Sequence, residues 1–426
     1  MSCFCSASFA AKPAAAVIHA VRSGDVMTAR TLLRPSDANA PLPDGSTLLA
    51  WAVEGQVPDM VRLLLDRGAK PNAPQTLSPL MVACQNGDAA IVNMLLDAHA
   101  DVNAPDRDGI TPVSVCAGSA SNEIMKRMIA AGADVEHADS NGQTPIMWAA
   151  AKGRVENIQL LMENGASINR ATQHGFTPLF FAIKSGNPNV PIAVMNAGGN
   201  PDYIAPDGTS AVQLAIYQKT YDFAARLIER GANLTTFDRN GRQLLHAAID
   251  ANQPSLVELL LAKGADVNAS TGPSRVKMRF EVNFKSGDYE APRSTPLLLA
   301  AEKGEANIMQ LLLNAGADKE HRREDGTNVV LAAAISGKLA ALELALRIQP
   351  DVNATNTRGQ TPLRVMLGSN ASSETIAMMQ LLAAKGARTD IQDRAGTTPA
   401  DAAKEAETEM KTAFEATFLN RTASNP

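Results

Sequence analysis

The side chains with most scope for chemistry in this sequence are its four cysteines and six histidines. The histidines share no spacing typical of metal ligands; they are His19, His99, His137, His174, His246 and His321. Cys84 and Cys116 lie near the middle of apolar segments, which predicts buried thiols rather than a disulfide framework. Cys3 and Cys5 have no cysteine or histidine nearby to complete a zinc site. We therefore expect no metal and no cofactor.

Catalytic motifs are also missing from the sequence. It contains no Gly-x-Ser-x-Gly, no His-Glu-x-x-His and no phosphate-binding glycine loop followed by lysine. Trp51 and Trp148 each stand three residues after a predicted helix start, where a buried apolar residue is expected, so we interpret both as packing residues. These observations predict a protein that is not an enzyme.

Length and charge narrow the class of protein further. A chain of 426 residues is too long for one ordinary core and must form several domains or a repeat array. Its net charge of −5 provides no broad cationic surface for nucleic acid. No apolar run approaches the ~18 residues that a membrane span needs.

Glycines reveal the elements of a repeat. One series recurs every 33 residues, at Gly109, Gly142, Gly175, Gly208 and Gly241, and Gly326 and Gly359 show the same step. A second series has the same spacing and follows the first by 23 residues, at Gly132, Gly165, Gly198, Gly231 and Gly264. Each unit therefore contains two fixed turns and is one supersecondary motif.

The residues between these glycines predict two helices per unit. Thr-Pro pairs place a hydroxyl at a helix N-cap and proline at the first helical position; they are 111–112, 144–145, 177–178, 295–296 and 361–362. A short alanine-rich helix follows, as in 145–153, and then a second helix with apolar residues at helical spacing, as in 308–312. The second helix ends at glycine, and an extended arm closed by a tight turn leads to the next unit.

This pattern resembles the ankyrin repeat, most fully at 139–169 and 294–318, and more weakly over about 14–400. The resemblance implies an all-α repeat solenoid of about eleven stacked helix-turn-helix repeats with projecting β-hairpin loops and a concave binding face. His246 occupies a position where such repeats often carry histidine, which implies a structural hydrogen bond. Some copies depart from the pattern: Ser210-Ala211 and Gln243-Leu244 replace Thr-Pro, His99 replaces a glycine, and the third unit lacks two residues.

We expect special segments at both ends of the array, which would span residues 14–400. Residues 1–13 are interpreted as a frayed N-terminus or as the remnant of a signal peptide, because Ser8-Phe9-Ala10 resembles a signal-cleavage site. Residues 401–426 are predicted to form a capping helix and tail, with Phe414 and Phe418 toward the last repeat. The expected location is cytoplasmic, or exported or periplasmic if the start site is truncated.

One insertion interrupts the array at 269–293. The helix starts at Gln243-Leu244 and Thr295-Pro296 lie 52 residues apart where 33 are expected, which leaves 19 extra. Apolar residues alternate with polar ones from Val276 to Phe284, which predicts a β-finger, with Gly287-Asp288 as its turn. The insertion either contacts a partner or only packs on its own array.

The resemblance also indicates which side chains contact a partner: those that the repeat pattern leaves free on hairpin tips and first helices. Apolar, aromatic and arginine side chains at such positions are typical of interfaces. The predicted partner-binding residues are Ile110, His174, Phe176, Tyr217, Arg239 and Arg242 in the repeats, and Arg279, Phe280 and Phe284 in the insertion. We predict a monomeric, non-enzymatic scaffold that binds another protein on the concave surface. The alternative is an inhibitor or protective cap of one enzyme that uses the 269–293 finger.

Overall fold

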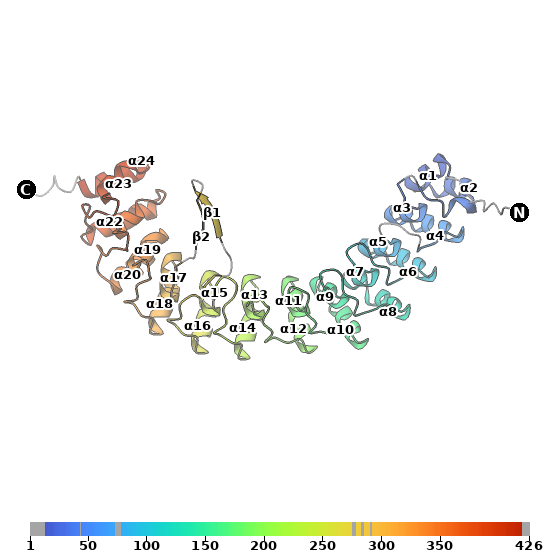
Figure 1. The fold of residues 1–426 in the computed structure, drawn as a ribbon, viewed down its shortest axis with the longest axis horizontal. Coiled ribbons are helices and arrows are strands. Elements are labelled where there is room, and N and C mark those ends of the chain that lie inside the picture. The colour runs from blue at the N-terminus through green and yellow to red at the C-terminus, as the bar shows by residue number, and fades with distance from the viewer. Residues whose placement is uncertain are drawn as a thin grey trace, which may run out of the picture. The chain divides into compact units, whose positions relative to one another are not determined.

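The chain forms two compact units, unit 1 (Met1–Pro201) and unit 2 (Asp202–Pro426). The computed structural model describes residues 13–42, 44–72, 78–274, 278–282, 285–289 and 292–419, without the side chains of 278–282 and 285–289. Both units consist of successive pairs of short helices (Figure 1). In the part of the chain that is described, no helix is long and apolar enough to cross a bilayer.

Unit 1 contains helices α1 to α12. The first helices of its repeats are α1 (Ala15–Arg22), α3 (Leu48–Glu54), α5 (Pro79–Asn86), α7 (Pro112–Ser119), α9 (Pro145–Ala151) and α11 (Pro178–Lys184). The second helices are α2 (Val26–Leu32), α4 (Pro58–Asp66), α6 (Ala89–Asp97), α8 (Asn122–Ala130), α10 (Val155–Glu163) and α12 (Asn189–Asn196), and a 3₁₀ turn, η1 (Pro35–Asp37), follows α2.

Unit 2 contains helices α13 to α24 and two strands. Its first helices are α13 (Ala211–Tyr217), α15 (Leu244–Asp250), α17 (Pro296–Lys303), α19 (Val329–Ser336), α21 (Pro362–Met366) and α23 (Pro399–Glu405). Its second helices are α14 (Tyr221–Glu229), α16 (Pro254–Ala262), α18 (Ala306–Asn314), α20 (Leu339–Ile348), α22 (Ser373–Ala384) and α24 (Thr408–Phe414), which a π-helical turn, η2 (Glu415–Leu419), extends. The strands are β1 (Met278–Val282) and β2 (Lys285–Tyr289).

Within each unit the helices form two layers, so the predicted all-α repeat solenoid is confirmed. First helices pack on first helices, as α7 does on α9, and second helices on second helices, as α8 does on α10 (Figure 1). Small residues allow this close packing: Ala149 and Ala150 of α9 are both 0% exposed. Leucine and isoleucine of the second layer complete the core, which therefore runs along the stack instead of gathering at a centre.

The threonines before the first helices act mainly through their backbone shape. Thr111 accepts a cap hydrogen bond from Ser114 N, and Thr361 from Arg364 N. The side chains of Thr144, Thr177 and Thr295 make no such bond, which corrects the predicted hydroxyl capping at these positions. All five residues have extended backbones, the conformation that a β-branched residue favours.

Acidic or amide side chains close the turns between repeats. Oδ1 of Asp139 accepts the N–H groups of Asn141 (2.9 Å) and Gln143 (2.8 Å), and Asp238 does the same for Asn240 and Arg242 (both 2.8 Å). Neighbouring turns are linked by backbone hydrogen bonds such as Ser140 N to Asp108 O at 2.8 Å. These loops are turns and not the predicted β-hairpins: outside β1 and β2, the described residues contain only one isolated bridge, Ile204 with Ser210.

Asparagines connect several of the arms to the end of the next repeat. We define an asparagine bridge as two bonds from one side chain: Asn169 donates to Gly198 O (2.9 Å) and accepts from Asn200 N (2.7 Å). The same pair of bonds recurs at Asn39, Asn72, Asn103 and Asn353. Thr235 occupies this position between α14 and α16, and its hydroxyl bonds only within its own turn, to Asn233 (2.9 Å). That junction therefore lacks a bridge.

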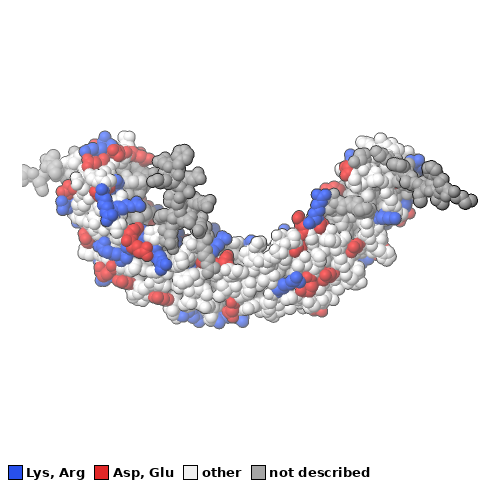
Figure 2. Space-filling model, viewed as in Figure 1, with Lys and Arg blue, Asp and Glu red and all other residues white. Residues whose placement is uncertain are grey.

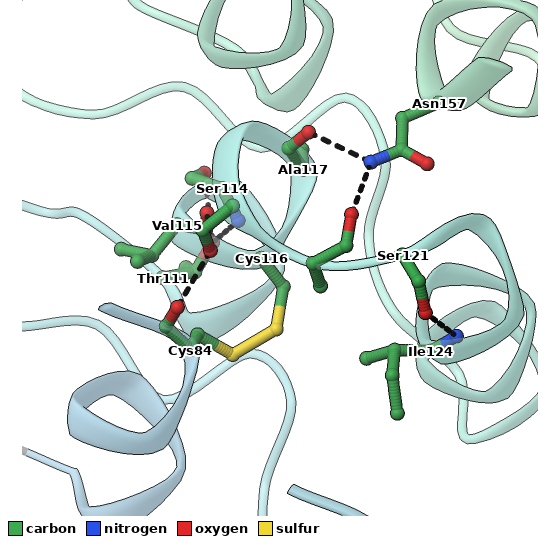
Figure 3. Close-up of a disulfide and its surroundings, with 11 residues drawn as sticks. Cys84, Thr111, Ser114, Val115, Cys116, Ala117, Ser121, Ile124 and Asn157 are labelled. Atoms are coloured by element: carbon green, nitrogen blue, oxygen red, sulfur yellow. Dashed lines mark hydrogen bonds between the residues drawn. A yellow bond between two sulfur atoms is a disulfide. The ribbon is translucent and has the colours of Figure 1, made fainter. Parts of the chain in front are cut away.

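Cys84 and Cys116 form a disulfide between α5 and α7, and the prediction of buried thiols was wrong (Figure 3). Both side chains are buried as expected. The error came from treating each cysteine within its own helix: α5 and α7 pack side by side, so the two Cα atoms are only 4.9 Å apart.

The insertion carries the antiparallel pair of strands β1 and β2. The first pair of the ladder is Met278 with Tyr289, and the last pair is Val282 with Lys285. Gly287 and Asp288 lie inside β2, opposite Phe280 and Arg279, and the turn predicted there was wrong. Apolar alternation reveals an extended chain but not where the chain reverses, which is why the position was missed.

The C-terminal residues form two helices, α23 and α24, against the last repeat. Phe414 is 2% exposed and its ring centroid lies 4.9 Å from that of Phe418. Lys404, Glu405, Glu407, Glu409 and Lys411 are all exposed. One side of this pair is therefore apolar and packed, and the other is charged and solvated.

Candidate functional site

The first-helix face of unit 1, defined by α7, α9, α11 and the arms before them, carries aromatic side chains at its surface. Phe176 is 36% exposed, and its ring centroid lies 6.0 Å from that of buried Phe180. Trp148 of α9 and Phe181 of α11 are half-buried and occupy equivalent positions of successive repeats. We call Trp148, Phe176 and Phe181 the aromatic set. Its members come from two repeats whose first helices pack against each other.

The two tryptophans are less buried than the sequence predicted, and only one has a polar partner. Trp51 donates from Nε1 to Ser46 Oγ at 2.7 Å, and the guanidinium of Arg22 lies 3.9 Å from its ring. Nε1 of Trp148 is buried and has no hydrogen-bond partner among the described residues. Both rings are half-buried because the fourth residue after the N-cap turns toward the first-helix face and not into the core. Sequence reasoning missed this because it assumed that every large apolar residue there is packed.

Two further predicted residues lie in unit 1, in different turns. Ile110 is half-buried where Asp106 closes its turn, and its N–H donates to that carboxylate at 2.9 Å. His174 is exposed at the tip of the turn before Phe176. Ile110 and Phe176 occupy equivalent positions two repeats apart, with Gln143 between them. The two residues therefore lie two repeats apart, Phe176 in the repeat that also carries Phe181.

The first-helix face of unit 2 carries a chain of polar contacts. Tyr217, at the end of α13, is 38% exposed and donates its hydroxyl hydrogen to Asp238, which is 1% exposed. Burial of the hydroxyl group and the adjacent Asp238 carboxylate raise the pKa of Tyr217 above its ordinary value. The phenol therefore stays protonated and acts as a structural donor.

Arg242 continues this chain across the next two repeats. Its Nε lies 3.0 Å from Asp250 Oδ2, and Lys303 Nζ lies 3.1 Å from Oδ1 of the same carboxylate. Both cations are thus already paired, whereas Arg239 is exposed at the tip of the turn. We name Tyr217, Asp238, Arg242, Asp250 and Lys303 the polar chain of unit 2. The link between Tyr217 and Asp238 crosses 21 residues of sequence and could not be inferred from either residue alone.

A small polar cavity of about 270 Å³ lies at the base of the insertion, lined by Arg242, Thr271, Ser294, Glu302 and Arg323 among others. Arg323 pairs with Glu302 and, at 2.8 Å, with Asp325. Burial acts to raise the pKa of Asp325, but hydrogen bonds from Arg323 and Thr327 outweigh it and lower this pKa to about 2. Arg242 is likewise paired with Asp250, so among the described residues that line the cavity each arginine is neutralised by a carboxylate.

The insertion carries the remaining predicted residues. Arg279 and Phe280 lie in β1, opposite Asp288 and Gly287 of β2. Phe284 lies outside the described residues. Thr271 and Ser294 join the two ends of the insertion through a hydrogen bond from Thr271 N to Ser294 O at 3.0 Å. This hydrogen bond closes the base of the insertion, which lies between α16 and α17 in the sequence.

His246 has the structural role that was predicted for it. The N–H of Gln243 donates to its Nδ1 at 3.3 Å, so Nε2 carries the hydrogen and donates to Ala269 O at 3.0 Å. Burial, followed by the charge of Arg242, lowers the pKa of His246 to about 4. The neutral imidazole therefore holds α15 to the start of the insertion.

These faces offer contact area and hydrogen bonds. Lys and Arg are interspersed with Asp and Glu on the face shown in Figure 2, with no continuous basic area among the described residues. Within the same residues, no group of three or more His, Cys, Asp or Glu side chains could hold a metal ion. The exposed apolar features are instead Phe176 of the aromatic set and single side chains such as Ile335, which is 45% exposed.

Comparison with known proteins identifies the repeat. A family model described as ankyrin repeats matches residues 17–106, 113–194, 192–271 and 297–393, which is more than half of the chain. The second and third matched ranges share residues 192–194. The gap between residues 271 and 297 contains most of the insertion.

Curated relatives match over part of the chain. The mouse (Mus musculus) B-cell lymphoma 3 protein homolog is 27% identical over 176 residues, 40% of this chain and 35% of that protein. Human (Homo sapiens) neurogenic locus notch homolog protein 2 is 30% identical over 172 residues, 39% of this chain and 6% of that protein. Mouse ankyrin repeat and SOCS box protein 16 is 27% identical over 221 residues, 46% of this chain and 48% of that protein. The chain thus spans less than half the length of each of these relatives.

Proposed function

Because the chain belongs to the ankyrin-repeat family, we propose that it is a non-enzymatic module that binds another protein through its first-helix face, which is the concave face in such arrays. Ankyrin repeats indicate a protein-protein interaction module. We propose in addition that the aromatic set of unit 1 is the centre of contact and that the protein acts as a monomer.

The observation that carries the proposal is the aromatic set itself. Aromatic residues are enriched at interface centres, where their large rigid surfaces bury much area at a small cost in side-chain entropy. Phe176 reaches the surface although a turn position open to water favours polar residues, such as Gln143 in the preceding repeat. The backbone around Phe176 is already fixed by its N–H bond to Thr172 Oγ1 at 3.0 Å. Little ordering would therefore oppose association.

The experiment compares two exposed apolar positions. The full chain and the variant Phe176→Ala/Phe181→Ala are used to capture proteins from the cells that produce it, and the affinity of each captured partner is then measured by calorimetry. We expect the variant to weaken binding about 30-fold or more, because a hot-spot residue contributes about 2 kcal/mol or more. Ile335→Ala, in α19 of unit 2, is the matched control and should bind normally. Equal binding by the aromatic variant would contradict the proposal.

The insertion supports a second candidate, an inhibitor or protective cap of one enzyme. The observation in its favour is the antiparallel pair β1 and β2, whose base is closed by Thr271 and Ser294. A variant in which a Gly-Ser linker replaces residues 275–291 tests it. If the variant still binds the partner and still affects its enzymatic activity as the full chain does, the cap hypothesis fails; if the partner is still bound but its enzymatic activity is no longer affected, the hypothesis is supported.

A further inference from the structure

A covalent link joins the third and fourth repeats of unit 1. The Cys84–Cys116 disulfide connects the last turn of α5 to the middle of α7, and both side chains are 0% exposed. The Cα separation of 4.9 Å lies within the range of native disulfides, so the backbone needs no adjustment to accommodate the bond. Figure 3 shows the bond between the two helices.

We propose that this disulfide is formed while the chain folds in an oxidising compartment, and that it locks the junction between the third and fourth repeats of the working protein. The inference favours export over the cytoplasmic location expected from the sequence. Disulfides persist in oxidising compartments and are reduced in most cytosols. A structural disulfide in the core of the array therefore indicates that the protein works in an oxidising compartment. Any partner that it binds would be in the same compartment.

The third repeat departs from the repeat pattern. Its helix start, Ser78, lies 31 residues after Thr47 instead of 33, whereas Thr111 follows Ser78 by the regular 33. His99 replaces the glycine that ends α6 and has a φ of 60°, a region that costs energy for a residue with a side chain. Stability in a repeat array is set by nearest-neighbour interfaces. The covalent link therefore joins the irregular third repeat to the fourth.

Hydrogen bonds extend the lock on both sides of α7. Ser119 Oγ lies 2.6 Å from Cys84 O and 2.9 Å from Val115 O, which adds a polar contact from α7 to α5. On the opposite side, Nδ2 of Asn157, which is 2% exposed, donates to Ala117 O and Ala120 O, both at 3.0 Å (Figure 3). The helix is therefore held to the repeat before it and to α10 after it. Loss of the disulfide would loosen the support of α9, which carries Trp148.

The bond forms by two thiol-disulfide exchange steps with a disulfide-bearing oxidant, such as an oxidoreductase of the compartment. The thiolate of one cysteine attacks the oxidant and releases one of its sulfurs as a thiolate, which leaves a mixed disulfide. The second cysteine thiolate then attacks the mixed disulfide, forms the Cys84–Cys116 bond and releases the second sulfur. The cysteines lose two protons and two electrons, and the oxidant becomes a dithiol. Because both sulfurs end fully buried, the exchange must precede final packing.

Thiol trapping in the producing cells tests the compartment. Cells are quenched in acid and treated with N-ethylmaleimide, and the denatured full-length chain is digested without reductant and analysed by mass spectrometry. We expect the Cys84 and Cys116 peptides to be joined and free of maleimide. A parallel sample reduced before labelling confirms that both cysteines can react. Maleimide on both residues in the unreduced sample would overturn the proposal.

Thermal unfolding tests the lock. Trp51 and Trp148 are the only tryptophans and both lie in unit 1, so their emission follows this unit. We expect reduction by dithiothreitol to lower the melting temperature of unit 1 by about 5 °C or more. The variant Cys84→Ala/Cys116→Ala should melt at one temperature with or without reductant; if it does not fold, the comparison of oxidised and reduced wild type decides. Identical melting of the two wild-type forms, with reduction verified by mass, would exclude a lock.

Discussion

The first-helix faces of the two units present different kinds of side chain. In unit 1 they hold the aromatic set, in which Phe176 is 36% exposed and the indole N–H of Trp148 has no partner among the described residues. In unit 2 they hold the polar chain, in which Tyr217 bonds to Asp238 and Asp250 pairs with two cations. Groups that satisfy one another contribute to stability, whereas the exposed ring of Phe176 remains available to a partner. The scaffold is the same, and its side chains decide which role a face has.

The largest difference that we expect between the two units is in the pH dependence of their stability. His246 should make the free energy of unfolding of unit 2 depend on pH. The pKa of His246 is about 4 in the folded chain, against about 6.5 unfolded. The unfolded chain therefore binds a proton more readily between these values, so stability is full above pH 6.5 and is lost as the pH falls toward 4. We expect a loss of about 3 kcal/mol below pH 4 from this residue, since one pKa unit corresponds to ~1.4 kcal/mol.

Urea unfolding between pH 7 and pH 4.5 measures this loss. Circular dichroism follows the whole chain, and tryptophan emission follows unit 1, which should change little. His246→Gln keeps a donor and an acceptor without a charge and should flatten the dependence. If wild type and His246→Gln lose the same stability, the imidazole is not the cause.

A second effect separates the turn of unit 2 from its counterpart in unit 1. Asp238→Ala removes an acceptor that is 1% exposed and serves two N–H groups and the Tyr217 hydroxyl. Asp139→Ala removes an equivalent acceptor that serves two N–H groups. We expect losses of about 2 and about 1 kcal/mol in free energy of unfolding, because each buried donor left without an acceptor costs free energy. Equal losses in urea denaturation would mean that Tyr217 adds nothing.

Changes to the asparagine bridges should have smaller effects on stability. Removal of a bridge in unit 1 should lower the free energy of unfolding, and addition of a bridge in unit 2 should raise it. Asn169→Ala in unit 1 removes bonds to Gly198 O and Asn200 N, and we expect it to cost about 1 kcal/mol. Thr235→Asn in unit 2 supplies a side chain that can reach Gly264 O and Asp266 N, and it should raise the urea midpoint. Hydrogen exchange at Asp266 reports directly on the new bond. Unchanged exchange there would show that Thr235 sits in a different geometry.

The smallest effect is expected for Phe176→Ala, which should change the free energy of unfolding by less than about 0.5 kcal/mol, as surface substitutions do. Tyr217→Ala, at a similarly exposed position, should cost about 1 kcal/mol because Asp238 loses a donor. Thermal denaturation of the two variants compares them. A large loss at Phe176 would make this ring part of the core and remove the basis for the aromatic set.

Much of this architecture could be predicted from the sequence because it depends on local geometry. Thr-Pro pairs and periodic glycines identify helix starts and left-handed ends without any distant contact. The bonds between repeats were missed, because each depends on two segments about one repeat apart. The 32-residue separation of Cys84 and Cys116, close to the repeat length, was the available signal for the disulfide. The recurrence of Asn39, Asn72, Asn103 and Asn169 at one arm position was the signal for the bridges.

The candidate site was less predictable than the fold. Phe176 and Tyr217 are both aromatic and occupy exposed positions, and nothing in their local sequence shows that Tyr217 reaches Asp238 in the next turn. Trp148 was assigned to packing because hydrophobicity alone does not indicate the direction of a side chain. Whether an aromatic side chain has a hydrogen-bond partner depends on how the repeats stack. Only the three-dimensional structure shows this.

The asparagine bridges also give the array a mechanical polarity. Each asparagine reaches only forward, from its own arm to the helix end of the following repeat, as Asn103 does to Gly132 and Asp134. A pulling force along the chain therefore has to shear these paired bonds one junction at a time. Junctions whose arm position lacks asparagine, such as the one at Thr235 in unit 2, do not have these paired bonds, so extension under load should begin at junctions of this kind, at lower force than the steps that follow.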